Sequence, residues 1–351
     1  MADRYLIVHT WGIGDMILLT PVLELIYHFL PDVRFDFAVF QSSSMLPIRN
    51  APYTSEVYQC SYKASKLLPM IAYLRRKKYD YCITTSGISA IKAGLFAWSI
   101  KARCRIGDYQ SKPNHLYTSQ IPFIVTRHRT WANYEIFKLI FPLPEAEAFR
   151  QNPLCSRLFR TRYYSKVSAS AEAKAFFSSY FDETDFVVAI HPGCTAKNKY
   201  RRWNLDYFVD LVSILNTDYP ALKFYVIAGP DELEESIALS KRITAPCLSG
   251  VSLDVVYETL KLSQMIINTD SGIGHIASCH QLPSFVIFGP GDERQTAPFN
   301  PQANIIRSDT PCAPCVQRKR TACSTDCLRN LKPKMVADII TAYVTESKLS
   351  I

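Results

Sequence analysis

Short apolar runs alternate with helix-like stretches along the chain, and no other feature limits the possible folds as strongly. In the first half we expect strands at 5–8, 34–40, 55–60 and 81–85. Helical periodicity lies between them, ending at Leu30 and covering 67–78 and 88–100. Strands that alternate with helices in this way pair in parallel, and the helices cover both faces of the sheet. The first half therefore predicts a Rossmann-like, doubly wound α/β domain.

The second half repeats this alternation. Strands are expected at 185–191, 223–228, 264–268 and 284–288, and helices at 205–215, 232–243 and 253–261. The pattern weakens between 112 and 168, where five prolines occur. We therefore predict an amino-terminal domain at 1–166, a carboxy-terminal domain at 167–333, and a helix within 334–351 that crosses back to the first domain. Two such domains in tandem predict a cleft facing the carboxyl ends of their strands.

The composition narrows the class of protein. Hydrophobic residues make up 48% of the chain and charged residues 20%, which excludes a disordered protein. The most apolar stretch, 16–30, is interrupted by Pro21, Glu24 and His28, so we expect no membrane span. The first residues lack the pattern of a secretion signal, and the eleven cysteines are mostly scattered. These features predict a cytoplasmic protein, since scattered cysteines suit a reducing compartment.

Positive charge is concentrated in the first half. Residues 1–166 contain 22 Lys and Arg against 11 Asp and Glu, whereas residues 167–351 contain 18 against 20. Concentrated basic charge attracts anionic partners such as nucleic acid, anionic lipid or a phosphorylated substrate. A solvated, lysine-rich surface accounts for the same charge equally well.

Four of the expected strands end in small and polar residues, at 9–15, 191–203, 228–232 and 269–275. In doubly wound sheets such ends meet at the ligand site. In the last of them Asp270 suits a helix cap, and Gly272 and Gly274 leave backbone N–H groups open to a ligand. Together with Ser271 and His275 they predict a phosphate site at a helix N-terminus. The alternative is a capped helix with a buried histidine.

These motifs resemble those of glycosyltransferase family 9, the heptosyltransferases of lipopolysaccharide core assembly. The resemblance rests on four patterns: D-S-G-x-x-H at 270–275, P-x-x-x-x-F-G-P at 283–290, G-x-G-D at 12–15 with Pro21, and H-P-G…R-W at 191–203. The similarity extends over about residues 4–345. It implies a GT-B fold and a metal-independent, inverting transfer from a nucleotide-diphosphate sugar, usually ADP-L-glycero-D-manno-heptose.

Asp15 is the expected catalytic residue. A carboxylate placed just after the first strand suits a general base that takes the proton from an acceptor hydroxyl. The resemblance implies the same role, and Gly12 and Gly14 keep the carboxylate accessible. A helix N-cap is the alternative for Asp15.

The nucleotide-sugar donor is expected on the second domain. The family usually has K-x-W-P or K-R-W-P where this chain has R-R-W-N at 201–204, so an arginine occupies the position of the family lysine. Either this arginine or a neighbouring lysine neutralises the diphosphate. The candidate donor residues outside 269–275 are Thr195, Ala196, Lys197, Lys199, Arg201, and Asp231 or Glu232 for the ribose.

An anionic acceptor accounts for the basic first domain. The resemblance implies an inner-core saccharide on lipid A, rich in carboxylates and phosphates and presented at the inner face of the inner membrane. We therefore expect a peripheral membrane protein whose partners do not include nucleic acid. The candidate acceptor residues are Gly12, Gly14, Lys63, Lys66, Arg103 within 101–105, and the basic residues at 75–78 and 127–129.

Four cysteines near the C-terminus form the pattern C-x2-C-x7-C-x3-C, at Cys312, Cys315, Cys323 and Cys327. Thiols at this spacing suit a structural Zn or Fe site. A reduced buried cluster and disulfides formed on oxidation are the alternatives. No cofactor is expected for catalysis.

Other functions compete with heptosyl transfer to lipopolysaccharide. One is a family member that uses another nucleotide sugar or a protein acceptor, and another is a nucleotide-sugar-binding protein without activity. Retention of Asp15 argues against loss of activity, because binding alone does not need that carboxylate. A nicotinamide-dependent dehydrogenase is excluded, because neither half opens with G-x-G-x-x-G.

Overall fold

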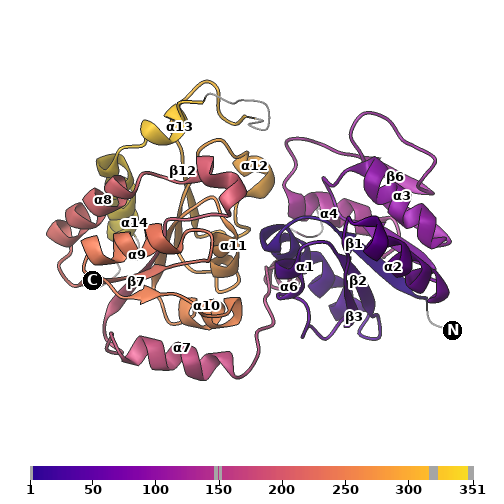
Figure 1. Ribbon diagram of the computed structural model, residues 1–351, viewed down its shortest axis with the longest axis horizontal. Coiled ribbons are helices and arrows are strands. Elements are labelled where there is room, and N and C mark those ends of the chain that lie inside the picture. Colours follow the sequence, from indigo (N-terminus) through magenta and orange to yellow (C-terminus); the bar gives the residue numbers. More distant parts are fainter. Residues whose placement is uncertain (1–2, 146–148, 150–151, 316–322, 347–351) are drawn as a thin grey trace. The chain divides into compact units, whose positions relative to one another are not determined.

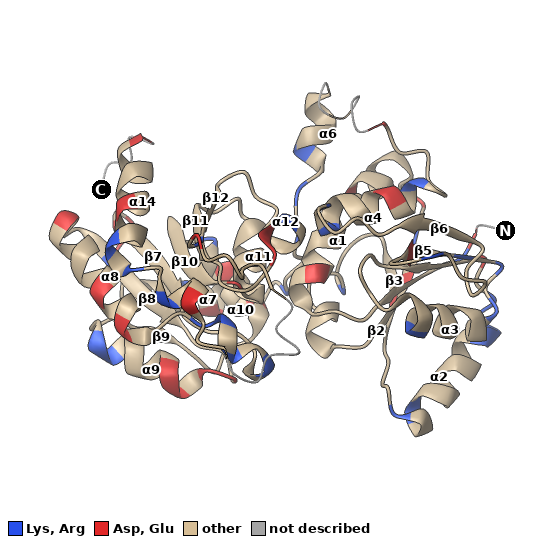
Figure 2. Ribbon diagram, turned by 90° about the horizontal axis from the view of Figure 1, so that it is seen from above, with Lys and Arg blue, Asp and Glu red and all other residues tan. Residues whose placement is uncertain are grey.

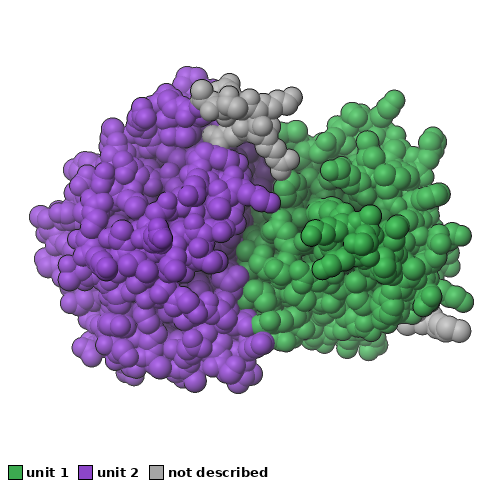
Figure 3. Space-filling model, in the orientation of Figure 1, with its two compact units in different colours: residues 1–164 green, residues 165–351 purple. Residues whose placement is uncertain are grey.

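The chain folds as two units, residues 1–164 and 165–351, drawn in different colours in Figure 3. The computed structural model describes residues 3–145, 149, 152–315 and 323–346. Each unit is built around its own six-stranded sheet in which all strand pairs are parallel. The alternation of strands and helices predicted this architecture.

The first unit has the strand order β3-β2-β1-β4-β5-β6. Helices α2 and α3 cover one face of this sheet, where Leu74 and Phe96 pack on Leu6 and Val8 (Figure 1). Its strands are β1 (Tyr5–His9), β2 (Phe35–Val39), β3 (Thr54–Gln59), β4 (Tyr81–Thr84), β5 (Cys104–Tyr109) and β6 (Ser119–Pro122). Its helices are α1 (Ile13–Phe29), η1 (Ser42–Met45), α2 (Ala64–Arg76), α3 (Ala90–Ile100), α4 (Arg129–Lys138) and α6 (Pro153–Leu158).

The second unit has the order β12-β11-β10-β7-β8-β9. Its strands are β7 (Phe186–His191), β8 (Leu222–Ile227), β9 (Cys247–Leu248), β10 (Met265–Thr269), β11 (Ser284–Ile287) and β12 (Ala303–Ile306). Its helices begin with α7 (Ala169–Ser178), η2 (Ala196–Arg201), α8 (Leu205–Asp218), α9 (Leu233–Arg242) and α10 (Leu253–Leu260). They continue with α11 (Gly272–Ser278), α12 (Glu293–Thr296), α13 (Asp326–Arg329) and α14 (Pro333–Glu346).

The last helix, α14, packs against α8 within the second unit. Its residues Val336, Ala337, Ile340 and Val344 belong to the same buried cluster as Phe208 of α8. The sequence had suggested a helix that crosses back to the first domain. The apolar face of α14 fills the core of the second unit, and residues 347–351 lie outside the described part of the chain.

The strand orders fix where a ligand is expected. In the first sheet the order in which successive strands are added reverses between β1 and β4, and in the second sheet it reverses between β7 and β10. We call each of these places the reversal point of its sheet. Loops that leave the carboxyl ends of such strand pairs diverge to opposite faces, which leaves a crevice for a ligand. In the described part of the chain, no helix has both the length and the apolarity needed to cross a bilayer.

Candidate active site

Asp15 lies at the reversal point of the first sheet. It is the third residue of α1, which begins directly after the loop that follows β1, and Gly12 occupies the N-cap. The Asp15 side chain is 27% exposed. Its partner among the described residues is Arg129, whose Nε lies 3.9 Å from Asp15 Oδ1. Because Gly12 rather than Asp15 is the N-cap, the carboxylate is left open to a substrate.

Arg129 is held beside Asp15 by the first turn of α4. Its guanidinium is 11% exposed and lies over the rings of Trp11 and Phe123, at 5.9 and 5.3 Å from their centroids. A methyl group at Gly87, whose φ is +75°, would lie 1.0 Å from Arg129 Nη1. Nε and Nη1 of Arg129 have no hydrogen-bond acceptor in the described part of the chain. A cation that is mostly shielded from water and has open donors is suited to an anionic group on a substrate.

Asp108, at the end of β5, braces the loop that contains Gly87. Its carboxylate accepts hydrogen bonds from the Ser86 hydroxyl at 2.7 Å and from the Gly87 N–H at 2.9 Å. Burial raises the pKa of Asp108, and these bonds partly offset that shift. His9 braces the same edge, because its ring bonds Thr85 Oγ1 at 3.1 Å and the Gly12 carbonyl at 3.3 Å. Burial lowers the pKa of His9, so its imidazole stays neutral at pH 7.

The other candidates on the first unit fall into two groups. Gly12, Gly14 and Lys63 lie on loops or helix starts that follow strands, at the same end of the sheet as Asp15. Arg103 lies at the opposite end, because it directly precedes β5. Its side chain is paired with Asp80 at 3.5 Å and Asp3 at 3.7 Å. The structure therefore does not bring Arg103 to the edge of the sheet at which Asp15 lies, and a role for Arg103 in binding the acceptor stays a prediction.

In the second unit Arg201 and Asp270 meet at the reversal point. Arg201 Nη1 lies 2.9 Å from Asp270 Oδ2, and the Asp270 side chain is 6% exposed. Ser271, not Asp270, is the N-cap of α11, and its hydroxyl makes no side-chain cap bond. Ser271 Oγ is buried and has no partner within the described residues, so it is available to a ligand. His275 is buried in the same short helix, and Gly272 begins it.

Several motif glycines make room for protein side chains. A methyl group at Gly274 would lie 2.6 Å from the Asn268 side chain, and one at Gly291 would lie 2.4 Å from Asp270. Gly193 and Gly229 both face Glu232. A methyl group at Gly193 would lie 2.1 Å from the Glu232 side chain, and one at Gly229 would lie 2.5 Å from it. At its strand end Gly274 suggests space for a ligand. The structure gives a different reason for that glycine, because the Asn268 amide fills the space.

Asp231 bonds the protein backbone. Its Oδ2 accepts a hydrogen bond from the Ala196 N–H at 3.0 Å, which joins the β8 loop to the start of η2. The sequence predicts Ala196 as a donor-binding residue and Asp231 or Glu232 as the partner of the ribose. Thr195 Oγ1 accepts a bond from Asn198 at 3.2 Å, and Lys197 and Lys199 are exposed. The two lysines are therefore exposed to solvent, whereas the Ala196 N–H is already bonded.

Arg202 has a structural position, unlike its neighbour Arg201. Its Nη2 donates to the Cys194 carbonyl at 2.6 Å and to the Asp231 carbonyl at 3.0 Å, and its Nη1 pairs with Glu235. Glu232 lies beneath, buried, and burial raises its pKa. His191 is also buried, which lowers its pKa to about 4. The two adjacent arginines thus have different partners: Arg201 pairs with Asp270, whereas Arg202 holds the loop in place.

The four cysteines near the C-terminus gather around Cys327. Burial, followed by the charges of Cys312, Cys315 and Cys323, raises the pKa of Cys327 to about 11. Cys312 and Cys323 are exposed. No group of three or more His, Cys, Asp or Glu side chains in the described ranges is arranged to hold a metal ion. The arrangement of these thiols therefore does not fit the tetrahedral site that their spacing predicted.

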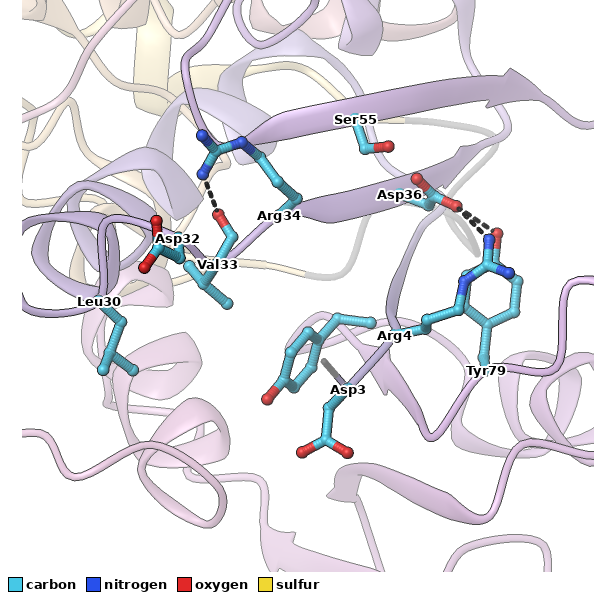
Figure 4. A pocket seen from close by; sticks show the side chains of 10 residues that line it. Asp3, Arg4, Leu30, Asp32, Val33, Arg34, Asp36, Ser55 and Tyr79 are labelled. Carbon is cyan, nitrogen blue, oxygen red and sulfur yellow. Dashed lines mark hydrogen bonds and ion pairs between the residues drawn. The ribbon is translucent and has the colours of Figure 1, made fainter. Parts of the chain in front are cut away.

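A pocket of about 430 Å³ opens elsewhere in the first unit, at the amino ends of β1 and β2 (Figure 4). Asp36 is the buried acid in its wall. It accepts bonds from the Tyr79 hydroxyl at 2.6 Å and the Glu56 N–H at 3.1 Å. Burial and the Asp36 charge raise the pKa of Tyr79, so the phenol stays protonated and donates. These satisfied bonds indicate a structural network at the end of the sheet opposite Asp15.

Each of the two Rossmann-like units thus has an acid and an arginine close together at the point where its strand order reverses. The chain belongs to glycosyltransferase family 9 (heptosyltransferase), whose family model matches residues 68–325. A curated relative, lipooligosaccharide heptosyltransferase 2 of Campylobacter jejuni, is 22% identical over 94% of each chain. The fold matches that of E. coli heptosyltransferase WaaC with ADP, with a TM-score of 0.70, 16% identity and coverage of 97% and 99% of the two chains. It also matches iron-containing dodecameric glycosyltransferase TibC of enterotoxigenic E. coli, with a TM-score of 0.56, 13% identity and coverage of 99% and 78%.

Membership of this family makes the protein a glycosyltransferase with a GT-B fold, as the resemblance implied. The sequence points to Arg129 only as one of several basic residues and to His9 only as part of the strand end 9–15, and it does not single out Asp108 or Ser86. No local signal distinguishes these residues, since each one bonds a partner at least 20 residues away in the sequence: His9 bonds Thr85, and Ser86 bonds Asp108.

Proposed function

We propose that the protein transfers heptose from ADP-L-glycero-D-manno-heptose, with inversion, to an anionic inner-core saccharide of lipopolysaccharide. The family model and a heptosyltransferase relative that covers 94% of the chain support the reaction class. A similar fold bound to ADP in E. coli heptosyltransferase WaaC supports the nucleotide. The observation that carries the proposal is Asp15, a partly exposed carboxylate whose described partner is a cation with open donors.

In this reaction Asp15 acts as general base. As the acceptor hydroxyl oxygen bonds to the anomeric carbon, its proton passes to a carboxylate oxygen of Asp15. The bond from the anomeric carbon to the diphosphate breaks on the opposite face, and the diphosphate leaves with the electron pair. Attack opposite the leaving group inverts the configuration. Arg129 holds Asp15 in place and offers its open Nη1 donor to an acceptor carboxylate or phosphate.

The second unit holds the donor. We propose that the Ser271 hydroxyl and the Arg201 guanidinium bind the diphosphate, with Lys197 and Lys199 reaching it from the exposed loop. Arg201 replaces the lysine usual in the family and can contact two phosphate oxygens at once. Asp270, Gly272 and His275 complete this edge of the proposed site.

A nucleotide panel tests the donor. ADP, UDP, GDP and CMP are each added to the purified protein, and the melting temperature is measured. Ligand at a hundredfold excess over its Kd stabilises the folded state by about 2.7 kcal/mol, which is roughly 5–10 °C for a unit of this size. We expect ADP alone to give that shift. A larger shift with UDP would reassign the donor to another nucleotide sugar.

Transfer itself is tested with ADP-heptose and a heptose-free inner-core acceptor, using mass spectrometry of the product. Wild-type protein should add one heptose, and Asp15→Asn should add none while still binding ADP. Product with a protein acceptor but not with the saccharide would favour the alternative acceptor. Binding of ADP without any transfer would identify an inactive nucleotide-sugar-binding protein.

The proposed acceptor places the protein in the cytoplasm, at the inner face of the inner membrane, with no part for nucleic acid. The structural metal at the four cysteines also stays a prediction, supported by the iron named for TibC and opposed by the arrangement of the described thiols. Metal analysis of anaerobically purified protein, with Cys315→Ser as control, tests it. If the purified protein contains no stoichiometric Zn or Fe, the predicted structural metal site is wrong.

A further inference from the structure

Helices α2 and α3 of the first unit carry apolar side chains on their outer surface. Ile91, Leu95 and Trp98 of α3 are 64%, 50% and 57% exposed, and they recur at the three- and four-residue spacing of one helix face. Leu68 of α2 is 65% exposed. Isolated exposed apolar residues are ordinary, but a stripe along one helix beside another exposed leucine indicates a surface that is covered in use.

The opposite faces of both helices are already occupied. Phe96 and Ile100 of α3, together with Leu74 of α2, are buried in one cluster with Leu6 and Val8 of the sheet. Since both helices pack on the same face of this sheet, their exposed residues point away from it. The stripe is therefore not part of the core of the first unit, and packing within that unit leaves its side chains exposed.

The charge around the stripe has a single sign. Residues 60–79 contain six Lys and Arg, residues 85–107 contain four, and neither stretch contains an Asp or Glu. Figure 2 shows this as blue without red along α2 and α3. Seven of these cations are exposed and make no ion pair within the part of the chain that the structure describes: Lys63, Lys66, Arg75, Arg76, Lys78, Lys92 and Lys101.

We infer that this α2–α3 surface docks the protein on an anionic lipid bilayer. Apolar side chains that enter the headgroup region, flanked by cations that meet anionic lipid, are the pattern of an interfacial helix. Trp98 suits the interface in particular, because an indole has an apolar body and a polar N–H. A second copy of this chain fits poorly, since two such faces would bring like charges together.

One end of the α2–α3 surface lies at the carboxyl edge of the sheet. Lys63 and Lys66 are at the start of α2, and Ile91 and Lys92 are at the start of α3, both directly after strands. This is the end of the sheet at which Asp15 lies. The inference deepens the proposed function, because it names the surface that brings a lipid-linked acceptor toward Asp15. The use of this surface in catalysis therefore rests on the proposed function.

Vesicle binding tests the inference without substrates. Full-length protein is sedimented with phosphatidylcholine vesicles, or with vesicles that also contain phosphatidylglycerol, and Trp emission is recorded. We expect binding to the anionic vesicles alone, a blue shift that Trp98→Phe abolishes, and weaker binding at higher salt. Ile91→Ser with Leu95→Ser should weaken binding about tenfold or more. Lys66→Gln and Lys92→Gln should each weaken it about fivefold.

Val167→Ser is the matched control, because Val167 is 94% exposed and lies in the second unit. Equal binding to neutral vesicles, or stripe variants that bind like wild type, would overturn the inference. A dimer that the Ile91→Ser and Leu95→Ser variant dissolves would assign the stripe to a second copy instead. Transfer to a soluble, delipidated acceptor should be unchanged in the stripe variant. Vesicle binding by a protein that transfers heptose to no acceptor would leave the docking surface in place and reject only the proposed function.

Discussion

Gly87→Ala is the substitution whose effect the structure defines most narrowly. The methyl group would lie 1.0 Å from Nη1, 2.1 Å from Cζ and 2.6 Å from Nη2 of Arg129. Ordinary contact begins near 3.4 Å, so the guanidinium must move by about 2.4 Å, the difference between 3.4 and 1.0. Such a shift removes Arg129 from its place 3.9 Å from Asp15.

Two effects on stability and activity follow. An alanine at φ +75° costs about 1–2 kcal/mol of backbone strain, which is roughly 2–8 °C in melting temperature for a unit of 164 residues. The displaced arginine adds to that loss. Misplacement of a positioning group by about 1 Å can lower a rate about a hundredfold, so we expect at least that fall in kcat. ADP binding should be unchanged, because its proposed site is on the second unit.

Gly250→Ala is the control for strain alone. Gly250 has nearly the same φ, +70°, and a methyl group there would meet nothing within 4 Å. Differential scanning fluorimetry and a heptosyl-transfer assay compare the two variants. In an Arg129→Ala background, Gly87→Ala should cost only the strain. A Gly87→Ala protein that loses no more stability and no more kcat than Gly250→Ala would refute the placement of Arg129.

Three further outcomes are expected. Asp15→Asn should lower kcat at least about a hundredfold without changing ADP affinity measured by calorimetry; loss of both would make Asp15 structural. Arg201→Met should weaken ADP binding with little change in melting temperature, whereas Arg202→Met should lower the melting temperature because it leaves two carbonyls and Glu235 without their donor. His191 has a pKa of about 4 in the folded protein against an ordinary 6.5, so the unfolded chain takes up its proton at higher pH. Stability should therefore fall by up to about 3 kcal/mol as the pH drops from 6.5 to 4, and urea titrations should show a smaller fall for His191→Gln.

The regular strands of both halves could be predicted because each is a short apolar run closed by glycine or polar residues. β5 was missed because it contains Arg105 and Asp108. In the structure Arg105 donates to the Leu116 carbonyl at 2.7 Å, and Asp108 accepts from Ser86. Polar residues are stable in that strand only because distant groups satisfy them, and a local pattern carries no record of those partners.

The glycines show the same limit at the candidate site. Their positions at strand ends predicted a ligand, yet Gly193 and Gly229 accommodate Glu232, and Gly274 accommodates Asn268. A sequence reveals that a side chain is absent, but only the fold reveals whether a ligand or another residue occupies the space. The polar strand ends therefore located the right edge of each sheet without giving the reason for every residue there.

The sequence by itself determined the two parallel sheets, the family, and the edge at which Asp15 and Asp270 lie, because these depend on local periodicity and on short motifs. Only the tertiary structure paired Arg129 with Asp15, separated the contacts of Arg201 from those of Arg202, and placed Arg103 beside Asp80. The physical reason is that charge and hydrogen-bond partners are chosen by distance in space. Residues far apart along the chain meet only when the sheet brings the ends of its strands together.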